Sequence, residues 1–334
     1  MAYRLYTIIM AWILSVSTMA EEYSMPFVFV EYNCENFFDC LHDTLKNDYE
    51  FLPESKHAWT PSRYYKKTND IARAIQQSGE MQEGDYHLPD IVALCEVEND
   101  SVLHKLTRRS ALKGVGYRYI MTDSPDQRGI DVAMLYNPLT FRVFQHYSIR
   151  ITPINRSHAT RDVLYIKGKG RTADTLHIFI VHAPSRSGGV KKSEAYRTHV
   201  ANRVIESVDS IRNISPDAPI IVAGDMNDYS NNRSIKKYIE AGLYEASLNA
   251  IGRNLLTTGV RGTYRYRGNW ESLDHIMLSP TLLARVSSCY ILDSPWLLEE
   301  DKTWGGMKPR RTYLGPVYNK GTSDHLPLVL IMEL

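Results

Sequence analysis

Short apolar runs of six to eight residues recur along the chain, and polar segments rich in Gly, Pro, Asn and Asp separate them. The runs are rich in Val, Ile and Leu, and their length suits strands buried in a sheet better than helices. The pattern predicts strands over Phe27–Tyr32, Asp90–Cys95, Asp131–Tyr136, Thr175–His182, Pro219–Gly224, Leu273–Leu278 and Leu326–Met332.

Three segments between these strands predict helices, over Lys66–Gln77, Ser101–Thr107 and Lys191–Ile211. In the longest one, apolar residues recur every three or four positions. This spacing predicts one buried stripe made of Tyr196, Val200, Val204, Val208 and Ile211. No internal repeat, low-complexity tract or long linker interrupts the alternation of strands and helices. We therefore expect one α/β domain from about residue 25 to residue 334.

The amino-terminal segment reads as a targeting signal. Arg4 precedes the apolar stretch Tyr6–Val16, which is too short to span a bilayer, and Thr18–Ala20 offers a small-x-small cleavage site before Glu21. We expect residues 1–20 to be a cleaved signal peptide, so that the protein is secreted or periplasmic without a stable membrane anchor. An uncleaved anchor or a buried first helix is the alternative.

Composition narrows the class of protein. The chain has 334 residues, of which 43% are hydrophobic and 23% charged, which excludes a largely disordered, collagenous or disulfide-dense chain. Lys plus Arg number 39 against 38 Asp plus Glu, giving a net charge of +1. This balance argues against binding of nucleic acid by bulk charge alone, although local basic loops remain open. We expect a monomer.

Four cysteines, Cys34, Cys40, Cys95 and Cys289, show no metal-ligand spacing. Cys34 and Cys95 end apolar strand-like runs, where a cysteine behaves as a small hydrophobe. A bond between Cys34 and Cys40 across a loop is one alternative, and free, buried thiols are the one the pattern favours.

Polar residues stand at the carboxyl ends of the predicted strands. Because ligand sites of α/β sheets gather at strand ends, these residues predict one functional site. They are Asn33 and Glu35 after the first strand, Glu96 after the second, His182 at the end of the fourth, and Asp225 with Asn227 after the fifth.

Glu96 with Asn33 and Glu35 offers oxygen ligands from two strands. Such a set suits a hard cation, so we expect Mg²⁺, with Mn²⁺ or Ca²⁺ as substitutes. A capping or salt-bridging role for Glu96 is the alternative.

Asp225 and Asn227 are spaced so that both side chains point to one side of an extended segment. The carboxylate can orient or deprotonate water, and the amide can hydrogen-bond an oxyanion. An Asx-type turn is the alternative for this motif.

His182 is followed by Arg186, and the pair can supply a proton to a leaving oxygen and a clamp for phosphate. A loop histidine in a Pro/Gly-rich turn is the alternative. Asp274 and His325 form a candidate dyad in which the carboxylate orients the imidazole, and Asp324 precedes the histidine.

The ordered series YNCENFFD, DIVALCEVEN, RGIDVAMLY, HAPSRSGG, IIVAGDMND, LDHIMLS and TSDHLPL resembles the endonuclease/exonuclease/phosphatase superfamily, whose members share the deoxyribonuclease I fold. The resemblance runs from about Phe27 to Leu334. It implies a four-layered α/β sandwich of two packed, mostly antiparallel sheets flanked by helices, and metal-dependent cleavage of phosphate esters.

The resemblance also implies roles for single residues. Glu96 matches the principal Mg²⁺ ligand, with Asn33 and Glu35 beside it. The remaining matches are Asp225 and Asn227 around the attacking water and phosphate, Asp274 as the partner of the histidine, and Asp324 with His325 as the closing pair. His182 fits the branch of deoxyribonuclease I and the neutral sphingomyelinases, whereas abasic-site nucleases carry a tyrosine there. The implied reaction is a one-step hydrolysis in which Asp225 or His325 activates water and His182 protonates the leaving alkoxide.

Two basic stretches are candidates for substrate recognition. Arg261–Ser272 interleaves arginines with aromatic residues, and Tyr264 and Arg265 could bind phosphate and stack bases. Gly305–His325 carries Lys308, Arg310 and Arg311. A strand with tyrosines packed on one face and a solvated loop are the respective alternatives.

Three classes of function stay open. A secreted Mg²⁺-dependent endonuclease that hydrolyses phosphodiesters in DNA or RNA is favoured by the two histidines and the basic, aromatic loops. A sphingomyelinase-like phosphodiesterase of lipid headgroups, or a phosphatase of inositol or other small phosphoesters, is favoured by the neutral net charge. A non-catalytic binding protein on this fold is disfavoured, because such a protein has no need of every acid and both histidines.

Overall fold

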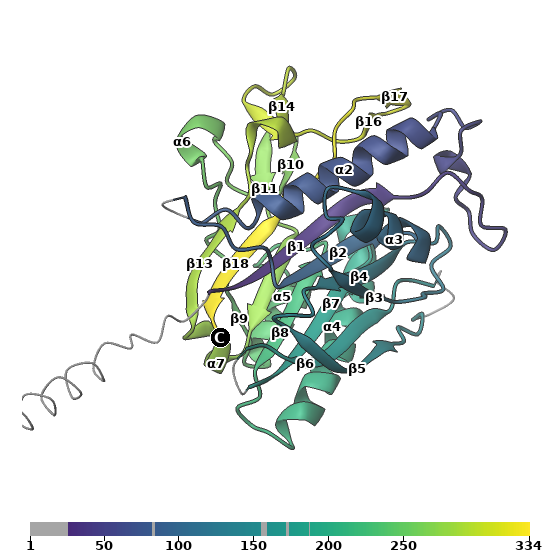
Figure 1. The fold of residues 1–334 in the computed structure, drawn as a ribbon. Helices are drawn as coiled ribbons and strands as arrows, with labels where there is room; N and C mark the ends of the chain where they lie inside the picture. The colour runs from purple at the N-terminus through teal and green to yellow at the C-terminus, as the bar shows by residue number, and fades with distance from the viewer. Residues whose placement is uncertain (1–25, 82–83, 155–158, 172–173, 187) are drawn as a thin grey trace, which may run out of the picture.

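Two six-stranded sheets form the centre of the structure, a computed structural model that describes residues 26–81, 84–154, 159–171, 174–186 and 188–334 (Figure 1). The first sheet contains β1 (Pro26–Phe37), β2 (Ile91–Val97), β3 (Arg118–Met121), β4 (Asp131–Tyr136), β13 (Val286–Ile291) and β18 (Leu328–Glu333). The second contains β5 (Arg142–Ile149), β6 (Val163–Lys169), β7 (Thr175–His182), β8 (Ile220–Asp225), β9 (Tyr244–Glu245) and β12 (Asp274–Leu278). Their strand orders are β13-β18-β1-β2-β4-β3 and β5-β6-β7-β8-β12-β9.

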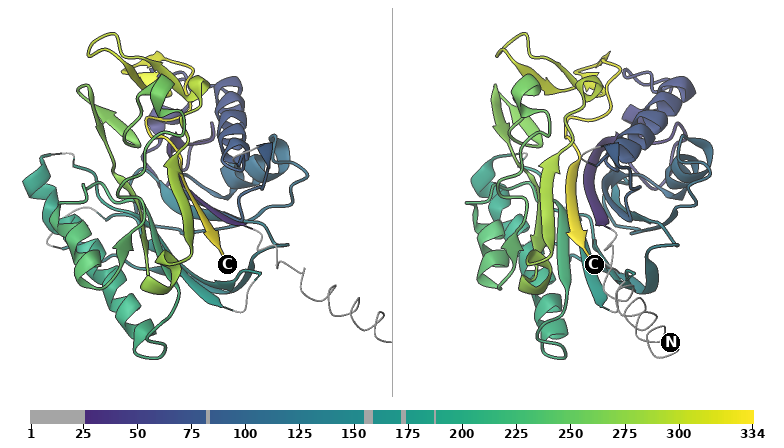
Figure 2. Two further views of the ribbon diagram at one scale, coloured as in Figure 1. Left: turned by 90° about the vertical axis from the view of Figure 1, so that its left-hand side faces the viewer. Right: turned by 60° about the vertical axis from the view of Figure 1, so that its left-hand side comes forward.

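Helices cover the outer face of each sheet, which gives four layers (Figure 2). On the first sheet these are α2 (Pro61–Gln77) and α3 (Asp100–Arg109), and on the second they are α4 (Val190–Arg212) and α5 (Arg233–Glu240). Within the sheets, β1–β2 and β7–β8 are parallel pairs and the other neighbours are antiparallel. The predicted four-layered sandwich of mostly antiparallel sheets is confirmed.

Shorter elements extend from this sandwich. Three two-stranded hairpins gather at one end of it (Figure 1). They are β10 (Tyr264–Tyr266) with β11 (Asn269–Glu271), β14 (Leu298–Glu300) with β15 (Met307–Pro309), and β16 (Tyr313–Leu314) with β17 (Val317–Tyr318). Short helical turns are η1 (Tyr49–Phe51), α6 (Leu255–Thr258), α7 (Pro280–Leu283) and η3 (Pro295–Leu297).

Each predicted strand is present, and β4 and β7 have the predicted bounds. Strands β1 and β2 continue past the predicted ends, so Asn33, Glu35 and Glu96 lie within strands, whereas the sequence placed them after strands. The reason is a bulge in each strand. The register of β1 against β2 shifts between Asn33 and Phe37, and that of β2 against β4 shifts between Cys95 and Val97. Bulges redirect side chains next to functional sites.

Two cores stabilise the sandwich. One fills the space between the sheets and under α2 and α3, and the other lies between the second sheet and α4 with α5. Val200, Val204 and Val208 of the predicted stripe are buried in the second core, and each contributes roughly 1.5–3 kcal/mol. Tyr196 from the same stripe is half-buried, because it lies near the amino end of α4 and lines a cavity.

The four cysteines are free thiols, so Cys34 and Cys40 are not bonded to each other. Cys34 and Cys95 are buried as expected, but Cys40 and Cys289 are half-buried. The predicted signal peptide, residues 1–20, lies outside the described residues. In the described part of the chain no helix is long and apolar enough to cross a bilayer.

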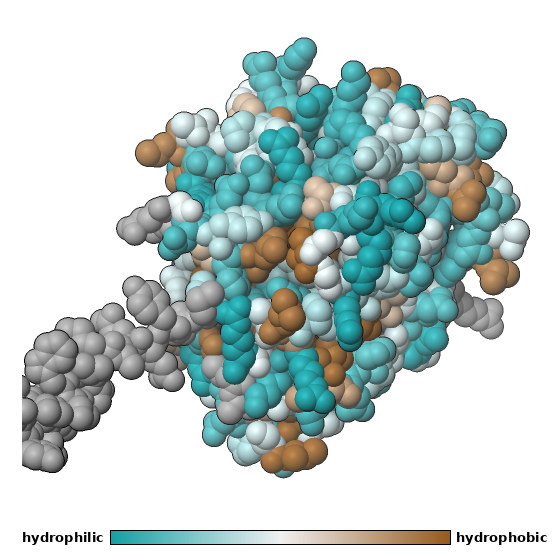
Figure 3. Space-filling view, viewed as in Figure 1, coloured by the Kyte–Doolittle hydropathy of each residue, from teal (hydrophilic) through white to brown (hydrophobic). Residues whose placement is uncertain are grey.

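Exposed apolar side chains are scattered over the surface. In the view of Figure 3 they form separate spots on a mostly hydrophilic face. Several belong to loops, including Leu41, Leu139 and Ile214. Single exposed apolar residues of this kind are normal in folded proteins.

A buried ion pair anchors the outer face of the second sheet. His275 Nδ1 lies 2.7 Å from Glu245 Oε1, and His275 Nε2 donates to the carbonyl of Asp228 at 2.8 Å. Burial lowers the pKa of His275, but the hydrogen bond and charge of Glu245 outweigh it and raise that pKa above its ordinary value. Both ring nitrogens then donate, so the ring is an imidazolium. In turn, burial raises the pKa of Glu245, but the hydrogen bond and charge of His275, with the hydrogen bond from Ser230, outweigh it and lower that pKa.

This pair predicts a pH-dependent stability. We expect His275→Gln to reduce the free energy of unfolding by about 3 kcal/mol near pH 6, because it leaves Glu245 buried without its partner. Because the pKa of His275 is raised, its contribution is complete below the ordinary histidine pKa and is lost as the pH rises through the raised value. Urea unfolding of both proteins from pH 5 to 9 measures the difference, with the exposed His146→Gln as control. A difference that does not shrink at high pH would contradict the prediction.

Candidate active site

The ends of six strands meet at the hairpin end of the sandwich. These are the carboxyl ends of β1, β2, β7 and β8 and the amino ends of β12 and β18. A cleft of about 940 Å³ opens there. Its lining includes Glu35, Glu96, His182, Arg186, Asp225, Asn227, Tyr264, Asp324 and His325, all of them predicted from the sequence.

Three of the predicted residues form a row across the second sheet. His182 on β7 pairs in register with Asp225 on β8, and Asp225 pairs with Asp274 on β12. Directly opposed residues on neighbouring strands point to the same face of a sheet. The row is therefore a property of strand register, and it brings together residues that are far apart in sequence.

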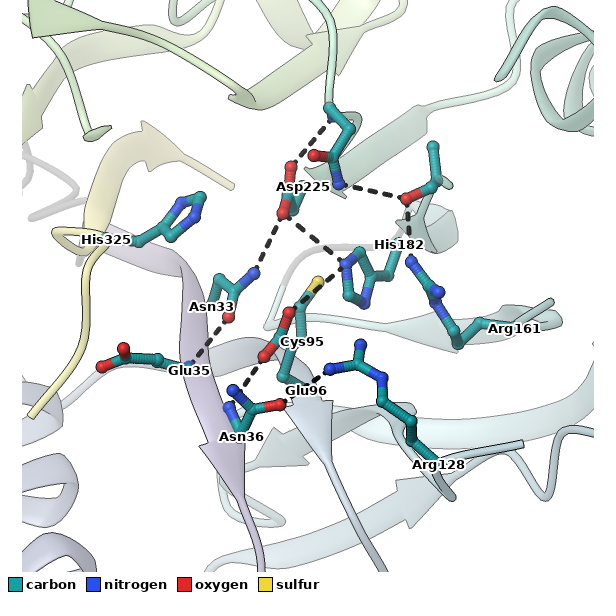
Figure 4. A network of polar contacts seen from close by, with 12 residues as sticks. Asn33, Glu35, Asn36, Cys95, Glu96, Arg128, Arg161, His182, Asp225 and His325 are labelled. Atoms are coloured by element: carbon teal, nitrogen blue, oxygen red, sulfur yellow. Dashed lines mark hydrogen bonds and ion pairs between the residues drawn. The ribbon is translucent and has the colours of Figure 1, made fainter. Parts of the chain in front are cut away.

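Asp225 is the centre of this row (Figure 4). Its Oδ2 accepts a hydrogen bond from Asn33 Nδ2 at 2.9 Å, which connects the two sheets, and lies 3.6 Å from His182 Nε2. Its Oδ1 accepts one from the backbone N–H of Asn227 at 2.9 Å, so the Asx-type turn is present as well. The Asn227 amide donates to the Ala183 carbonyl at 3.1 Å. Burial raises the pKa of Asp225 to about 7, with the charge of Asp274 as a contributing cause.

The glycine before Asp225 allows two strands to lie close together. Gly224 lies inside β8 with φ +140°, and a Cβ there would stand 1.8 Å from the Val181 carbonyl oxygen. Strands β7 and β8 can therefore approach closely enough only with glycine at this position.

Glu96 lies on the bulge of β2 with φ 62°, in the left-handed region that is uncommon for side chains larger than glycine. Its Oε2 accepts a hydrogen bond from the backbone N–H of Asn36 at 2.7 Å, and its Oε1 lies 3.8 Å from His182 Nε2. The carboxylates of Glu96 and Asp225 thus flank one histidine nitrogen (Figure 4).

Glu35 does not join Glu96, although the sequence grouped them. The Glu35 carboxylate accepts hydrogen bonds from Arg311 Nε at 3.0 Å and from the backbone N–H of Thr312 at 2.7 Å. Arg311 also donates to Asp324 Oδ2 at 2.6 Å. Burial, and then the charge of Asp324, raise the pKa of Glu35 to about 7. The bulge in β1 is the cause, because it directs Glu35 away from the cleft centre (Figure 4).

The structure brings Asp274 and His325 together. His325 Nδ1 lies 2.7 Å from Asp274 Oδ2, which also accepts a hydrogen bond from the Thr263 hydroxyl. Ser323 accepts from the His325 backbone N–H at 3.0 Å and donates to the Asn33 carbonyl at 2.7 Å. Burial lowers the pKa of His325, but the charge and hydrogen bond of Asp274, together with the charges of Asp225 and Asp324, outweigh it and hold that pKa well above its ordinary value.

The pKa of His182 is shifted in the opposite direction from that of His325. Burial, then the charges of Arg161 and Arg128, hold its pKa well below the ordinary histidine value. Its Nε2 faces two carboxylates, and its buried Nδ1 has no hydrogen-bond partner within the described ranges of the chain. The neutral tautomer with hydrogen on Nε2 fits these contacts. A neutral His182 has one N–H proton, on Nε2, and donates it in a hydrogen bond. The proton that we expect His182 to give to the leaving alkoxide must be this one.

Two of the three predicted substrate-binding residues line the cleft. Tyr264 lines the cleft with its ring 5.0 Å from that of His325. Arg186 also lines it, and donates to the Asn227 carbonyl at 3.0 Å and to Asn232 Oδ1 at 2.6 Å.

Arg265 is the exception, because its guanidinium donates to the carbonyls of Met307 and Gly305 outside this cleft. Of the three basic residues Lys308, Arg310 and Arg311, only Arg311 lines the cleft. Lys308 pairs with Glu299, and Arg310 donates to the Asn319 carbonyl.

Sequence reasoning missed three residues. Arg128 and Arg161 line the cleft on the side of His182 (Figure 4). Arg128 stands at the start of the motif RGIDVAMLY, and Arg161 gave no signal. Glu31 is fully buried on β1, and burial, with the charges of Asp274 and Asp225, holds its pKa well above its ordinary value. A glutamate inside the apolar run FVFVEY was the signal for it.

The donor set fits a divalent cation in two ways, both of which use Asp225. Glu96 and Asp225 supply carboxylate oxygens of the kind that Mg²⁺ prefers. Asn33 stands beside them, with its Nδ2 toward Asp225 and its Oδ1 accepting a hydrogen bond from the Glu35 backbone N–H at 2.9 Å. Among the described residues, Asp225, Asp274 and His325 have ligand atoms that all lie within 4.8 Å of one another. An ion held here would polarise a phosphoryl oxygen and offset developing negative charge.

Residues 28–334 match the sequence model of the endonuclease/exonuclease/phosphatase family, and the chain belongs to that family. Its members are phosphoesterase hydrolases. Comparison with curated protein sequences gives no match.

Solved structures share the fold. An endonuclease/exonuclease/phosphatase family protein of Bacteroides thetaiotaomicron is 18% identical with a TM-score of 0.60, covering 93% of this chain and 99% of that one. A mannosyl-6-phosphatase of the same organism is 17% identical with a TM-score of 0.60, covering 92% and 99%. The human Nocturnin catalytic domain with bound sulfate is 17% identical with a TM-score of 0.54, covering 92% and 93%.

The two arrangements of the cation predict different effects of two variants on metal affinity. We expect Glu96→Gln to weaken Mn²⁺ binding by about 10- to 100-fold while the fold survives, because it removes a ligand charge. Asp274→Asn is the matched comparison, and we expect it to retain Mn²⁺ affinity within about threefold. Calorimetric titration of each apoprotein measures both. The reverse order of effects would place the ion between Asp225, Asp274 and His325.

Proposed function

We propose that the protein is a secreted, monomeric, Mg²⁺-dependent phosphodiesterase and that a nucleic acid strand, cut internally, is its best-supported substrate. The observation that carries this proposal is the extension of the cleft on both sides of Asp225. A phosphodiester has a substituent on each side of the phosphorus, whereas a monoester has one.

The two sides of the cleft differ in chemistry. Beyond His182 lie Arg128 and Arg161, and the cleft continues there into a second cavity. Beyond His325 lie Tyr264 and Tyr266, the latter 48% exposed on its hairpin. Aromatic faces next to a phosphate-binding centre support stacked bases, and arginines support backbone phosphates.

Each of the clustered residues in the cleft has a separate role in the reaction. His325, which carries the proton in the dyad, stabilises negative charge on the phosphoryl group or supplies a proton. Asp225 lies next to it and orients the attacking water. His182 donates a hydrogen bond from Nε2 to an oxygen of the scissile phosphate. Glu96 and Asp225 would hold the cation, with Asn33 hydrogen-bonded to Asp225 beside it.

A phosphatase of small phosphoesters or a lipid-headgroup phosphodiesterase is the second candidate. The specific observation in its favour is the loss of charge from the predicted basic loops. Arg265, Lys308 and Arg310 are engaged within the chain, and Arg311 is matched by the carboxylates of Glu35 and Asp324.

A substrate panel separates the candidates. We expect the exported protein, beginning at or near Glu21 by mass spectrometry, to cleave DNA or RNA with Mg²⁺ and to lose activity in EDTA. KM for a polynucleotide should rise steeply with salt, because binding releases counterions. Hydrolysis confined to sphingomyelin, phosphoinositides or 4-nitrophenyl phosphate, with little salt dependence, would support the second candidate instead. No hydrolysis of any of them would refute both.

The dyad predicts a pH effect. Asp274 raises the pKa of His325, so Asp274→Asn should lower it. Because the pKa of His325 is held above its ordinary value, we expect the alkaline limb of kcat/KM on a labelled oligonucleotide to move to lower pH by about one unit in this variant. A shift of the acid limb would instead make His325 the base. Profiles of the two proteins that coincide would remove the dyad from the reaction.

A further inference from the structure

A second cavity of about 490 Å³ adjoins the cleft on the side of His182. Arg128, Arg161 and Ser185 line both, so the two spaces are continuous. The far wall of the cavity comes from the first turns of α4, which supply Lys192 and Tyr196. None of the catalytic roles described above uses this space.

Positive charge dominates the lining. Arg128, Arg161 and Lys192 line the cavity together with a single acid, Asp126. Asp126 Oδ2 lies 3.4 Å from Arg161 Nη1 and so offsets one of the three charges. Lys192 is exposed and forms no ion pair with the described residues. The cavity therefore has a net positive charge that no side chain of the described chain balances.

The lining also contains unused hydrogen-bond donors. The Arg161 side chain is 9% exposed; its Nη2 donates to the Ala183 carbonyl at 2.9 Å, but its Nε has no hydrogen-bond partner among the described residues. The hydroxyl oxygen of Thr160 is buried, and no residue in the described part of the chain is its hydrogen-bond partner. Helix α4 begins after Gly189 with no side-chain cap, which leaves backbone N–H groups of its first turn available. Buried donors without partners are rare in proteins and call for an acceptor.

We propose that this cavity binds a second phosphate of the substrate, carried by the fragment that extends past His182. This inference rests on the proposed phosphodiesterase function and specifies its substrate as a diester with a further phosphate on that side. Charged, forked donors and a helix amino terminus together suit a phosphate. Ile151 and the ring of Tyr196 give the same cavity an apolar wall for the sugar that joins the two phosphates.

Paired variants on α4 test the proposal. Lys192→Ala removes a lining charge, and Lys191→Ala removes an equally exposed neighbouring charge that does not line the cavity. The substrates are a thymidine dinucleotide without terminal phosphate and its 5′- and 3′-phosphorylated forms. For one of the phosphorylated forms, we expect Lys192→Ala to lower the preference in kcat/KM over the unphosphorylated dinucleotide by about tenfold. Lys191→Ala should retain that preference.

Binding without turnover provides a second readout. Calorimetric titration with thymidine 3′,5′-bisphosphate in EDTA should show weaker binding to Lys192→Ala than to Lys191→Ala. Thr160→Val should weaken that binding about threefold without lowering Tm, because the hydroxyl it removes bonds to none of the residues that the structure describes. Equal effects of the two lysine variants in both assays would overturn the inference. Lys192-dependent binding with no hydrolysis of any dinucleotide, DNA or RNA would overturn the proposed function and leave the anion site standing.

Discussion

The hydrogen bond from Asn33 to Asp225 joins the two sheets at the point where both carry ionisable side chains, and the site depends on it. Asp225, Asp274 and Glu31 are all buried near this contact. Burying carboxylates together raises the free energy of their charged forms, so each needs donors, a proton or a cation. Asn33, the Asn227 backbone and His325 meet part of that need. The requirement explains why polar residues end so many apolar strands here.

The strand register decides which of these residues meet. Sequence periodicity predicted the strands, and the rule that sites gather at strand ends predicted Glu96, His182 and Asp225 as neighbours. The dyad of Asp274 and His325 followed from chemistry and from the family resemblance. These predictions succeed because apolar patterning specifies which residues reach the same end of a sheet.

The sequence could not predict where side chains point at positions where the backbone is irregular. Glu35 and Glu96 both have positive φ on bulges, yet one points toward Arg311 and the other into the cleft. Arg161 reaches the cleft from a loop whose path depends on tertiary packing, and Arg265 is held by backbone carbonyls of a distant hairpin. Hydrophobic periodicity does not show where a strand has a bulge. Composition does not show which arginines form hydrogen bonds or ion pairs with other residues of the chain.

The pairing of β18 with β1 has a consequence for how the protein folds. It closes a loop that contains nearly the whole chain, and such long-range pairings form slowly. A partly folded state without β18 would retain the second sheet and its core with α4, but would lack His325 beside Asp274. It would also expose the edge of β1, an apolar strand open to pairing with another copy. Recovery of catalysis during refolding would therefore report the arrival of β18, and the interval before it is when aggregation is most favoured.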